Sequence, residues 1–591
     1  MSVHLKPQVI ALLRDALASV APDQRQVAIA LERPKQADHG DLATNLALQL
    51  AKPLKANPRD IAAQLVRKLP HADVIARAEV AGAGFINLFL TPAAKQRTVR
   101  AVLAAGETYG RSDVGRKKKV QVEFVSANPT GPLHVGHGRG AAFGASLANI
   151  LDFAGYAVTR EFYINDAGRQ MDILALSTWL RYLELYGESV PFPPNGYQGG
   201  YVGDMARQIG DAHGPRYVHE ARAVLAGVPP LPTPERKDAD AQEAREAHLD
   251  ALIANAKDLL GEDYAYIHRH ALTEQLADCR DDLAEFGVHF DLWFSEASLF
   301  DTGLVQRAVT TLEKRGYVYT QDGARWFRST AFGDEKDRVV QRDNGLYTYF
   351  ASDIAYHLNK YERGFERIVD IWGADHHGYI PRVKGAIQAL GLNADKLDVA
   401  LVQFAVLYRD GQKTSMSTRA GEFVTLRELR REVGNDAARF FYVLRKSDQH
   451  LDFDLDLAKS QSQDNPVYYL QYAHARVCSV LRQWQVRFDG AQGELAAADL
   501  TPLTGERELA LCARLGEFPE VIESAAADYA PHQIAFYLKD VAADFHSYYN
   551  AERILVDDQT QRRARLALVA AVRQVLHNGL RLLGVSAPET M

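Results

Sequence analysis

The sequence has few cysteines and no long apolar run. Three cysteines occur in 591 residues, Cys279, Cys478 and Cys512, and they form no CxxC pair. This spacing argues against a disulfide framework and against a cysteine zinc site. The sequence contains no run of about 18 apolar residues, the length that is needed to cross a bilayer. Arg14 and Asp15 interrupt the first apolar segment, where a signal peptide needs a continuous one. We therefore expect a cytoplasmic protein with no membrane partner and no structural metal.

The composition is that of an ordinary globular protein. Hydrophobic residues make up 47% of the chain, charged residues 24%, and the mean hydropathy is −0.24. These values exclude a disordered, collagen-like or coiled-coil protein. At about 150 residues per domain, the length predicts roughly four structural units.

The net charge of −7 is unevenly distributed. Residues 1–120 hold 19 Lys+Arg against 10 Asp+Glu, a net charge of +9, which leaves −16 for the other 471 residues. A basic segment attached to an acidic body could bind the phosphates of a nucleic acid, although a solvated charged surface gives the same pattern.

Residues 1–112 are predicted to form a small α+β domain. Helical spacing covers 7–20, 41–53 and 58–69, and a strand pattern covers 84–90. We expect this domain to precede a larger one of a different class.

Residues 113–458 are predicted to form an α/β domain with a doubly wound, Rossmann-type parallel sheet. A strand at 119–125, a helix at 137–153 and a strand at 156–163 make a βαβ unit. Further strand patterns cover 367–372 and 399–407.

An insertion and a helical C-terminal domain complete the predicted organisation. Pro-rich and Gly-rich stretches between about 190 and 265 indicate an insertion in the α/β domain, with outer bounds near 175 and 330. From 459 to 591 the spacing is helical almost throughout, which predicts an all-α bundle.

The most informative segment, SANPTGPLHVGHGRG at 126–140, joins the first strand of the α/β domain to its first helix. Open α/β sheets bind ligands at this position, and the N–H groups of a helix start favour phosphate. His134 and His137 can both donate to phosphoryl oxygens, and Gly136 lets a base approach the backbone. The segment therefore predicts nucleotide binding.

Other interpretations of this segment have less support. A zinc site built on His134 and His137 lacks further ligands nearby. A dinucleotide fingerprint starting at Gly138 would have to follow the strand directly, and about a dozen residues intervene. A purely structural loop stays open, whereas a GxxxxGK[ST] phosphate loop is absent from the sequence.

Together with five other segments, this motif resembles the arginyl-tRNA synthetases, a family of class I aminoacyl-tRNA synthetases. His134-Val-Gly-His137 is similar to their HIGH signature, and the resemblance covers nearly the whole chain. The segments that carry it are ANPTGPLHVGH (127–137), EFYINDAG (161–168), YTYFASDIAYH (347–357), WGADHHG (372–378), NPVYYLQYAHAR (465–476) and LGVSAPETM (583–591).

The resemblance implies an arginine–tRNA ligase with three domains. L-arginine would be activated by ATP, accompanied by Mg²⁺, to an adenylate and then transferred to the 2′-OH of the terminal adenosine of tRNA(Arg). His134 and His137 would be catalytic by holding the phosphates, and Asn128, Gly136 and Gly138 would bind ATP.

The resemblance also implies an arginine pocket. The guanidinium would meet Glu123, Tyr349 and Asp353, because a planar five-donor cation requires carboxylates and a hydroxyl or aromatic partner. The α-amino and α-carboxylate groups would be held by Ser126 and Asn128, with His377 nearby. Taken alone, each of these residues is more often structural.

The second class I signature lies at KTSMSTRAG (413–421) and departs from the KMSKS pattern. Thr418 replaces the lysine that usually neutralises phosphate, and the position that compensates in some relatives is Gly131 here. Lys413 or Arg419 would supply the charge, with Ser417 as a further catalytic residue and Met416 at the ATP.

Two groups of residues are candidates for tRNA binding. In the N-terminal domain, the resemblance implies that Asn87 and Phe85 meet the D-loop, and core packing is the alternative for Phe85. The phosphate contacts would be Lys52, Lys55 and Arg59. The anticodon candidates of the C-terminal bundle are Tyr468, Tyr472, Tyr537 and Met591, although tyrosines at helical spacing are more often core residues.

Two other functions stay open at this stage. The altered second signature would suit a catalytically silent relative that only binds tRNA. A small-molecule nucleotidyltransferase would share the histidines, but it needs neither the basic N-terminal domain nor the helical tail. We expect an active enzyme that works as a monomer.

Overall fold

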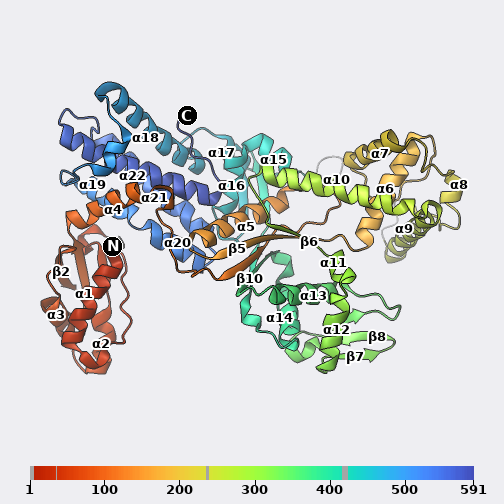
Figure 1. Ribbon diagram of the computed structural model, residues 1–591, viewed down its shortest axis with the longest axis horizontal. Coiled ribbons are helices and arrows are strands. Elements are labelled where there is room, and N and C mark those ends of the chain that lie inside the picture. The colour runs from red at the N-terminus through yellow and green to blue at the C-terminus, as the bar shows by residue number, and fades with distance from the viewer. Residues whose placement is uncertain (1–4, 35, 234–237, 415–423) are drawn as a thin grey trace. The chain divides into compact units, whose positions relative to one another are not determined.

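The computed structural model describes residues 5–34, 36–233, 238–414 and 424–591 (Figure 1). The chain divides into two compact units. One unit consists of residues 113–459, and the other combines residues 1–112 with 460–591.

The first unit, 113–459, is built on a five-stranded sheet in which all neighbouring strands are parallel. The strand order is β11 (Leu397–Val402), β10 (Arg367–Gly373), β4 (Lys119–Glu123), β5 (Ala157–Ile164) and β6 (Leu292–Ser295). Sequence order reverses between β4 and β10, which is the point where doubly wound sheets bind ligands. The predicted doubly wound parallel sheet is confirmed.

Helix α5 (Val135–Phe153) connects β4 to β5 and is almost entirely buried. Its small residues allow close packing on the sheet: a Cβ at Gly144 would lie 2.3 Å from the ring of Phe124. The other helices of this part of the unit are α6 (Arg169–Leu185), α10 (Asp263–Glu285), α11 (Ala297–Asp301), α12 (Leu304–Lys314), α13 (Tyr349–Glu362), α14 (Ile380–Ala389), α15 (Leu426–Val433), α16 (Asn435–Val443) and α17 (Leu455–Lys459).

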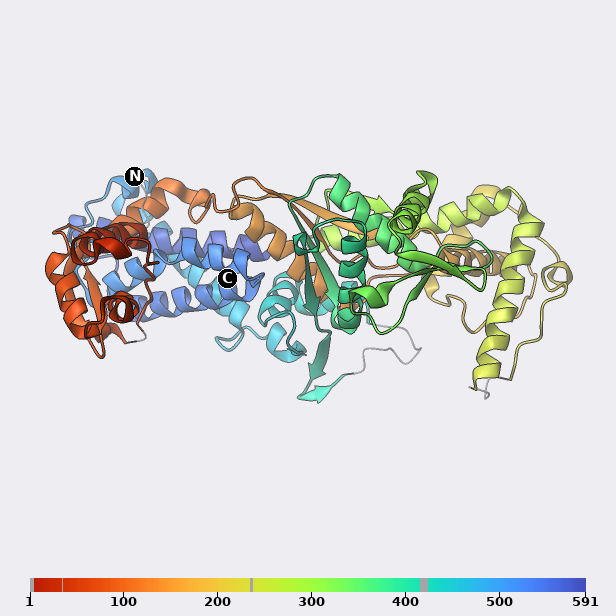
Figure 2. The same ribbon diagram turned by 90° about the horizontal axis from the view of Figure 1, so that it is seen from below.

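The insertion is shorter than predicted. Helices α7 (Gly200–His213), α8 (Ala221–Val224) and α9 (Ala239–Leu260) pack with α6 and α10 around their own hydrophobic core. They lie apart from the central sheet in both views (yellow in Figures 1 and 2). However, β6 falls inside the expected range 175–330 and pairs with β5 in the central sheet. Because β6 has only four residues and lies between helices, its alternating pattern is too short to be recognised in the sequence. The sequence therefore did not show that the chain rejoins the central sheet there.

Two small sheets complete this unit, and one of them corrects a predicted strand. The segment 399–407 is not one strand, because β11 ends at Val402 and β12 (Ala405–Arg409) belongs to a different sheet. That sheet has the order β13 (Gln412–Lys413), β12, β14 (Leu451–Asp454), and the other, antiparallel sheet has the order β7 (Val318–Gln321), β8 (Ala324–Phe327), β9 (Arg338–Gln341).

The second unit contains a small antiparallel sheet covered by helices. Its order is β1 (Leu42–Thr44), β3 (Phe85–Leu90), β2 (Ile75–Ala81), and α1 (Leu5–Val20), α2 (Leu46–Leu54) and α3 (Pro58–Lys68) share its core. The helix predicted over 41–53 is wrong at its start, because residues 42–44 pair with β3 and the helix begins after Asn45.

The rest of this unit is a helical bundle, as predicted. It consists of α18 (Pro466–Phe488), α19 (Glu506–Leu515), α20 (Phe518–Ala527), α21 (Pro531–Ala551) and α22 (Gln559–Leu583), together with α4 (Pro92–Ala105). Helix α4 packs against α19 and α22, and the Asn578 amide donates to the carbonyls of Gly106 and Tyr109. These contacts explain why residues 1–112 form one unit with the bundle. Among the helices described, none has the length and apolar character that crossing a membrane requires.

Candidate active site

The loop after β4 begins with a strained turn. Val125 and Ser126 have φ values of 67° and 42°, in the left-handed region that residues with side chains seldom occupy. The turn places the Ser126 hydroxyl where it donates to Glu123 Oε1 at 3.0 Å and accepts from the Tyr163 N–H at 3.1 Å. Ser126 therefore links the ends of β4 and β5.

The two histidines of the first motif cap helix α5. His134 is the N-cap residue, and its Nδ1 accepts from the Gly136 N–H at 3.1 Å, while His137 Nδ1 accepts from the His134 N–H at 3.3 Å. The two rings stack with centroids 3.7 Å apart. Since both Nδ1 atoms accept hydrogen bonds, the neutral rings carry their protons on Nε2.

Burial keeps both rings neutral. Burial lowers the pKa of His134, and it lowers the pKa of His137 to about 3, with the neighbouring His134 as a second cause. The site at the start of α5 thus offers neutral N–H donors and the positive end of a helix dipole.

The glycines of this motif have different surroundings. Gly136 lies at the helix start, where a Cβ would approach the His134 ring at 2.8 Å and the half-exposed Phe404 at 3.3 Å. Gly138 is buried, and a Cβ there would lie 2.8 Å from Tyr442. Gly138 therefore serves the packing of α5 against α16.

Helix α13 presents two of the predicted arginine-binding residues at its first turns. Tyr349 is its first residue and is 56% exposed, and Asp353 follows one turn later, half-buried. The Asp353 carboxylate accepts a hydrogen bond from the Tyr379 hydroxyl. Burial raises the pKa of Asp353. A Cβ on Gly168 would lie 3.4 Å from the Tyr349 hydroxyl, so this tyrosine reaches toward the loop after β5.

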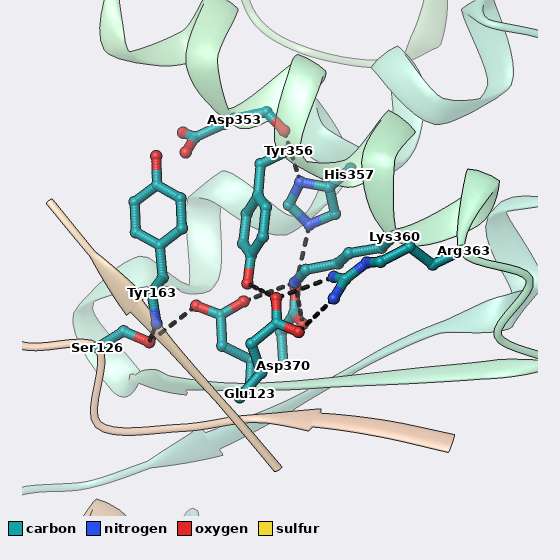
Figure 3. A network of polar contacts seen from close by, with 10 residues as sticks. Glu123, Ser126, Tyr163, Asp353, Tyr356, His357, Lys360, Arg363 and Asp370 are labelled. Atoms are coloured by element: carbon teal, nitrogen blue, oxygen red, sulfur yellow. Dashed lines mark hydrogen bonds and ion pairs between the residues drawn. The ribbon is translucent and has the colours of Figure 1, made fainter. Parts of the chain in front are cut away.

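Glu123, the third predicted guanidinium partner, is part of a buried network (Figure 3). Its Oε2 accepts from Lys360 Nζ at 2.5 Å, in addition to the Ser126 bond at Oε1. Burial raises the pKa of Glu123, Lys360 opposes this shift and Asp370 adds to it. The sequence did not indicate Lys360, because a lysine near a helix C-terminus is normally solvated.

Glu296 and Tyr163 are further buried polar residues near this network that the sequence did not single out. Glu296 is 2% exposed, and burial raises its pKa to about 7, with Asp353 contributing in the same direction and the Ser352 and Tyr163 hydroxyls opposing it. Tyr163 lies between Ser126 and Asp353 in Figure 3. A glutamate directly after a short strand was the only available signal for Glu296.

The remaining predicted residues are dispersed. Asn128 is exposed and accepts from the Asn165 amide at 3.1 Å. His377 is exposed in the 3-10 helix Ala374–Tyr379, and the nearby Tyr379 is the residue that contacts Asp353. Lys413 is exposed at the end of β13. Met416, Ser417 and Arg419 lie outside the described residues.

Comparisons with known proteins agree along the whole chain. Three family models match: "Arginyl tRNA synthetase N terminal domain" at residues 7–90, "tRNA synthetases class I (R), catalytic domain" at 98–184 and 261–450, and "DALR anticodon binding domain" at 470–591. An arginine–tRNA ligase of Azoarcus sp. (strain BH72) is 73% identical over 100% of both chains. The chain belongs to the arginyl-tRNA synthetase family. A second such ligase, from Aromatoleum aromaticum, is 72% identical over 100% of both chains.

A solved arginyl-tRNA synthetase has the same fold. The Thermus thermophilus structure superimposes with a TM-score of 0.72 at 25% identity and covers 99% of this chain and 100% of its own. The family model for the catalytic domain leaves out 185–260, which is where α7–α9 form their separate core.

The predicted RNA-binding residues of the N-terminal part lie on the central strand β3 and around helices α2 and α3. Phe85 is 40% exposed, whereas Asn87 is 8% exposed on the central strand β3. A Cβ on Gly84 would lie 2.8 Å from Pro58, so Phe85 begins its strand next to the start of α3. The exposed cations Lys52, Lys55 and Arg59 lie on both sides of the start of α3 in the sequence.

In the bundle of this synthetase, one predicted anticodon contact is wrong. Tyr537 is 5% exposed, stacks on Phe518 and donates to the Arg514 carbonyl at 2.9 Å, so it belongs to the core. Tyr468 and Tyr472 are partly exposed and stack on each other with parallel rings on α18. Met591 is 55% exposed.

Proposed function

We propose that the site at the carboxyl ends of β4 and β10 holds L-arginine and ATP together for adenylate formation. The chain is an arginine–tRNA ligase of class I, which uses ATP to attach L-arginine to tRNA(Arg) through an arginyl-adenylate, with transfer to the 2′-OH of the terminal adenosine. Catalysis of such a step relies mainly on placing the reactants and stabilising charge. The observation that carries the proposal is the position of a carboxylate cluster beside the histidine-capped helix at the point where the sheet order reverses.

In this proposal the guanidinium of arginine meets Asp353, Glu123 and the Tyr349 hydroxyl. Asp353 and Tyr349 come from adjacent turns of one helix face, and Glu123 comes from the end of β4. The charge-assisted bonds of a guanidinium to carboxylates are stronger than neutral ones. The α-amino and α-carboxylate groups then lie toward Ser126 and Asn128, with His377 at the outer side.

ATP in this proposal lies over the start of α5. The Nε2–H groups of His134 and His137 donate to its phosphoryl oxygens, and Gly136 and Asn128 border the nucleotide. Mg²⁺ accompanying the ATP would neutralise part of the phosphate charge. We do not assign Gly138 to the nucleotide, because its position is filled by Tyr442.

The charge of the missing signature lysine comes from Lys413 or Arg419 in this proposal, with Met416 and Ser417 in the same signature. Lys413 stands at the end of β13 and is the first residue of the signature segment. The double variant Lys413→Ala/Arg419→Ala removes both charges. If it forms adenylate at the parent rate, this part of the proposal is rejected.

The tRNA contacts in this proposal are Phe85, with Asn87 beside it, and the cations Lys52, Lys55 and Arg59 at the D-loop. In the anticodon part they are Tyr468, Tyr472 and Met591. Exposed aromatic rings and cations are the groups that bind unstacked bases and phosphates. We further propose that the enzyme acts as a monomer in the cytoplasm, which sedimentation and fractionation test.

Arginine-dependent ATP–pyrophosphate exchange, measured with and without tRNA(Arg), tests the proposed function. We expect exchange that requires both arginine and tRNA. Exchange without a tRNA requirement would contradict the proposed coupling. The absence of exchange under all conditions, together with tRNA binding, would favour a catalytically silent relative.

A further inference from the structure

Three carboxylates lie in register across the middle of the main sheet. Asp370 on β10 pairs with Glu123 on β4, and Glu123 pairs with Glu161 on β5. We call these three residues the carboxylate row. Their exposed fractions are 0%, 8% and 0%, so the row is buried. Like charges directly opposite each other in a sheet repel, and a buried charge requires a partner.

Helix α13 supplies partners for the carboxylate row. Lys360 Nζ donates to Glu123 Oε2 at 2.5 Å and to Asp370 Oδ1 at 2.7 Å, and its side chain is completely buried. Arg363 binds both oxygens of Glu161, at 2.6 and 2.9 Å, and the Tyr356 hydroxyl donates to Glu161 Oε1 at 2.6 Å. Figure 3 shows Lys360 between Glu123 and Asp370.

His357 is a further contact between α13 and the carboxylate row. Its Nδ1 lies 2.7 Å from the Asp353 carbonyl oxygen, and its Nε2 lies 3.0 Å from Asp370 Oδ2. Both oxygens are acceptors. The His357 ring therefore lies between the backbone of α13 and Asp370, beside the Lys360 contact with the same carboxylate.

The electrostatics of Lys360 agree with this arrangement. Burial disfavours its charge, but Asp370 and Glu123 outweigh burial and raise the pKa of Lys360. Burial also opposes ionisation of Asp370, and Lys360 and His357 outweigh it, so the pKa of Asp370 lies below its usual range. The ammonium is thus a fixed, charged link between two strands and one helix.

Lys360 lies on the same helix as the two α13 residues of the proposed arginine pocket. Asp353, His357 and Lys360 follow one another at spacings of four and three residues, which places them on one face of α13. The Lys360–Glu123 bond therefore connects the helix that carries Tyr349 and Asp353 to the strand that carries Glu123. A shift of α13 along the sheet would change the distance between the carboxylates that flank the guanidinium.

We propose that Lys360 is a positioning residue for arginine recognition, which fixes the spacing between Glu123 and the Tyr349–Asp353 turn of α13. The proposal rests on the proposed arginine pocket. The ammonium contacts no substrate; it acts by holding one oxygen of Glu123 and by anchoring the helix. Charge balance alone would be a purely structural role, and the two roles differ in their effect on substrate affinity.

The test uses the double variant Lys360→Met/Asp370→Asn in the full-length enzyme. It removes one cation and one carboxylate, so the net buried charge is unchanged, but the link between α13 and Glu123 is lost. We expect the KM for arginine to rise about tenfold or more, whereas the KM for ATP stays within about twofold. Aminoacylation is measured at saturating tRNA(Arg), and thermal denaturation checks that the variant is folded. An arginine KM within about twofold of the parent in the folded variant would overturn the proposal.

Two further variants keep the test decisive. Lys360→Arg retains the charge but replaces the single ammonium nitrogen by a planar guanidinium, so we expect a raised arginine KM for this variant too. If the double variant does not fold, an unchanged arginine KM in Lys360→Arg contradicts the positioning role. The matched control is Glu362→Gln on the same helix, whose exposed ion pair with Arg307 lies outside the pocket, and it should change neither KM.

Glu123→Gln distinguishes failure of the proposed arginine pocket from failure of the positioning role of Lys360. If it leaves the arginine KM unchanged, the proposed pocket is wrong. If it raises the arginine KM and both Lys360 variants do not, the pocket stands and the positioning role of Lys360 is rejected.

Discussion

The two ends of the proposed active site hold their functional groups in different ways. At the arginine end, the buried carboxylates Glu123 and Asp370 are held by Lys360 of α13, and the half-buried Asp353 carboxylate accepts a hydrogen bond from the Tyr379 hydroxyl. At the phosphate end, His134 and His137 are neutral rings held by backbone N–H groups. A cationic substrate is recognised by fixed negative charge, whereas a polyphosphate meets neutral donors and a helix dipole.

This difference matters for catalysis as well as for binding. Neutral N–H donors can stabilise the negative charge that develops on the phosphate in the transition state without binding ATP too strongly in the ground state. In the proposed function, the full positive charge would come from the Mg²⁺ that accompanies ATP and from the second signature. The following predictions test the contrast between the charged end and the neutral end.

The largest effect is expected at the charged end. Asp353→Asn should lower kcat/KM for arginine by about 2–5 kcal/mol, because the guanidinium loses an ionised partner. The KM for ATP should stay near its parent value. Steady-state aminoacylation with varied arginine and varied ATP measures both quantities, and an unchanged kcat/KM for arginine removes Asp353 from the pocket.

At the neutral end, His134→Asn separates capping from phosphate binding. Asparagine is a good N-cap and keeps an acceptor for the Gly136 N–H, but it lacks a donor at the position of Nε2. We expect an unchanged thermal midpoint and an exchange rate lowered about 100-fold, the effect of losing one donor to a developing anion. His134→Ala, which loses both groups, should also lower the midpoint. A fully active Asn variant would mean that the histidine serves only as a cap.

The smallest effect concerns pH. The pKa of Glu296 is raised to about 7 in the folded protein, above its value of 4.5 in an unfolded chain. The folded state therefore binds the proton more tightly, and the stability this contributes is complete below pH 4.5 and is lost as the pH rises through 7. Glu296→Gln should remove this loss, about 2 kcal/mol between pH 5 and 8.

Thermal midpoints of parent and Glu296→Gln at several pH values measure this difference. Glu285→Gln is a suitable comparison, because Glu285 is exposed on α10 and bonded to Arg430. Parallel pH curves for the parent and Glu296→Gln would show that Glu296 does not titrate in this range.

The phosphate end was easier to predict from the sequence than the arginine end. The strand–loop–helix pattern around His134 and His137 is local, and it predicted the β4–loop–α5 structure, whereas nucleotide binding at these two residues stays a prediction. The residues that hold Glu123 and Asp353 are remote in the sequence: Lys360 of α13 reaches Glu123 at the end of β4, and Tyr379, which follows β10, reaches Asp353 of α13, which precedes β10. The periodicity of residues along one sequence contains no information about which remote residues come into contact.

The errors in the fold have similar causes. The strand β1 is only three residues long and is stabilised by pairing with β3, so helical spacing dominated the prediction over 41–53. The break between β11 and β12 at Gln403 and Phe404 has no glycine or proline to mark it. Tyr537 was indistinguishable from an exposed tyrosine until α20 and α21 were seen to pack together.

Equilibrium binding of L-arginine and L-citrulline tests the central claim most directly. Citrulline has nearly the shape of arginine but a neutral side chain, so fixed negative charge should discriminate strongly between them. With tRNA(Arg) bound, we expect calorimetry to give an affinity at least about 100-fold weaker for citrulline, and Asp353→Asn to reduce this ratio. Similar affinities of the parent enzyme for both amino acids would contradict recognition of arginine by the carboxylates of Asp353 and Glu123.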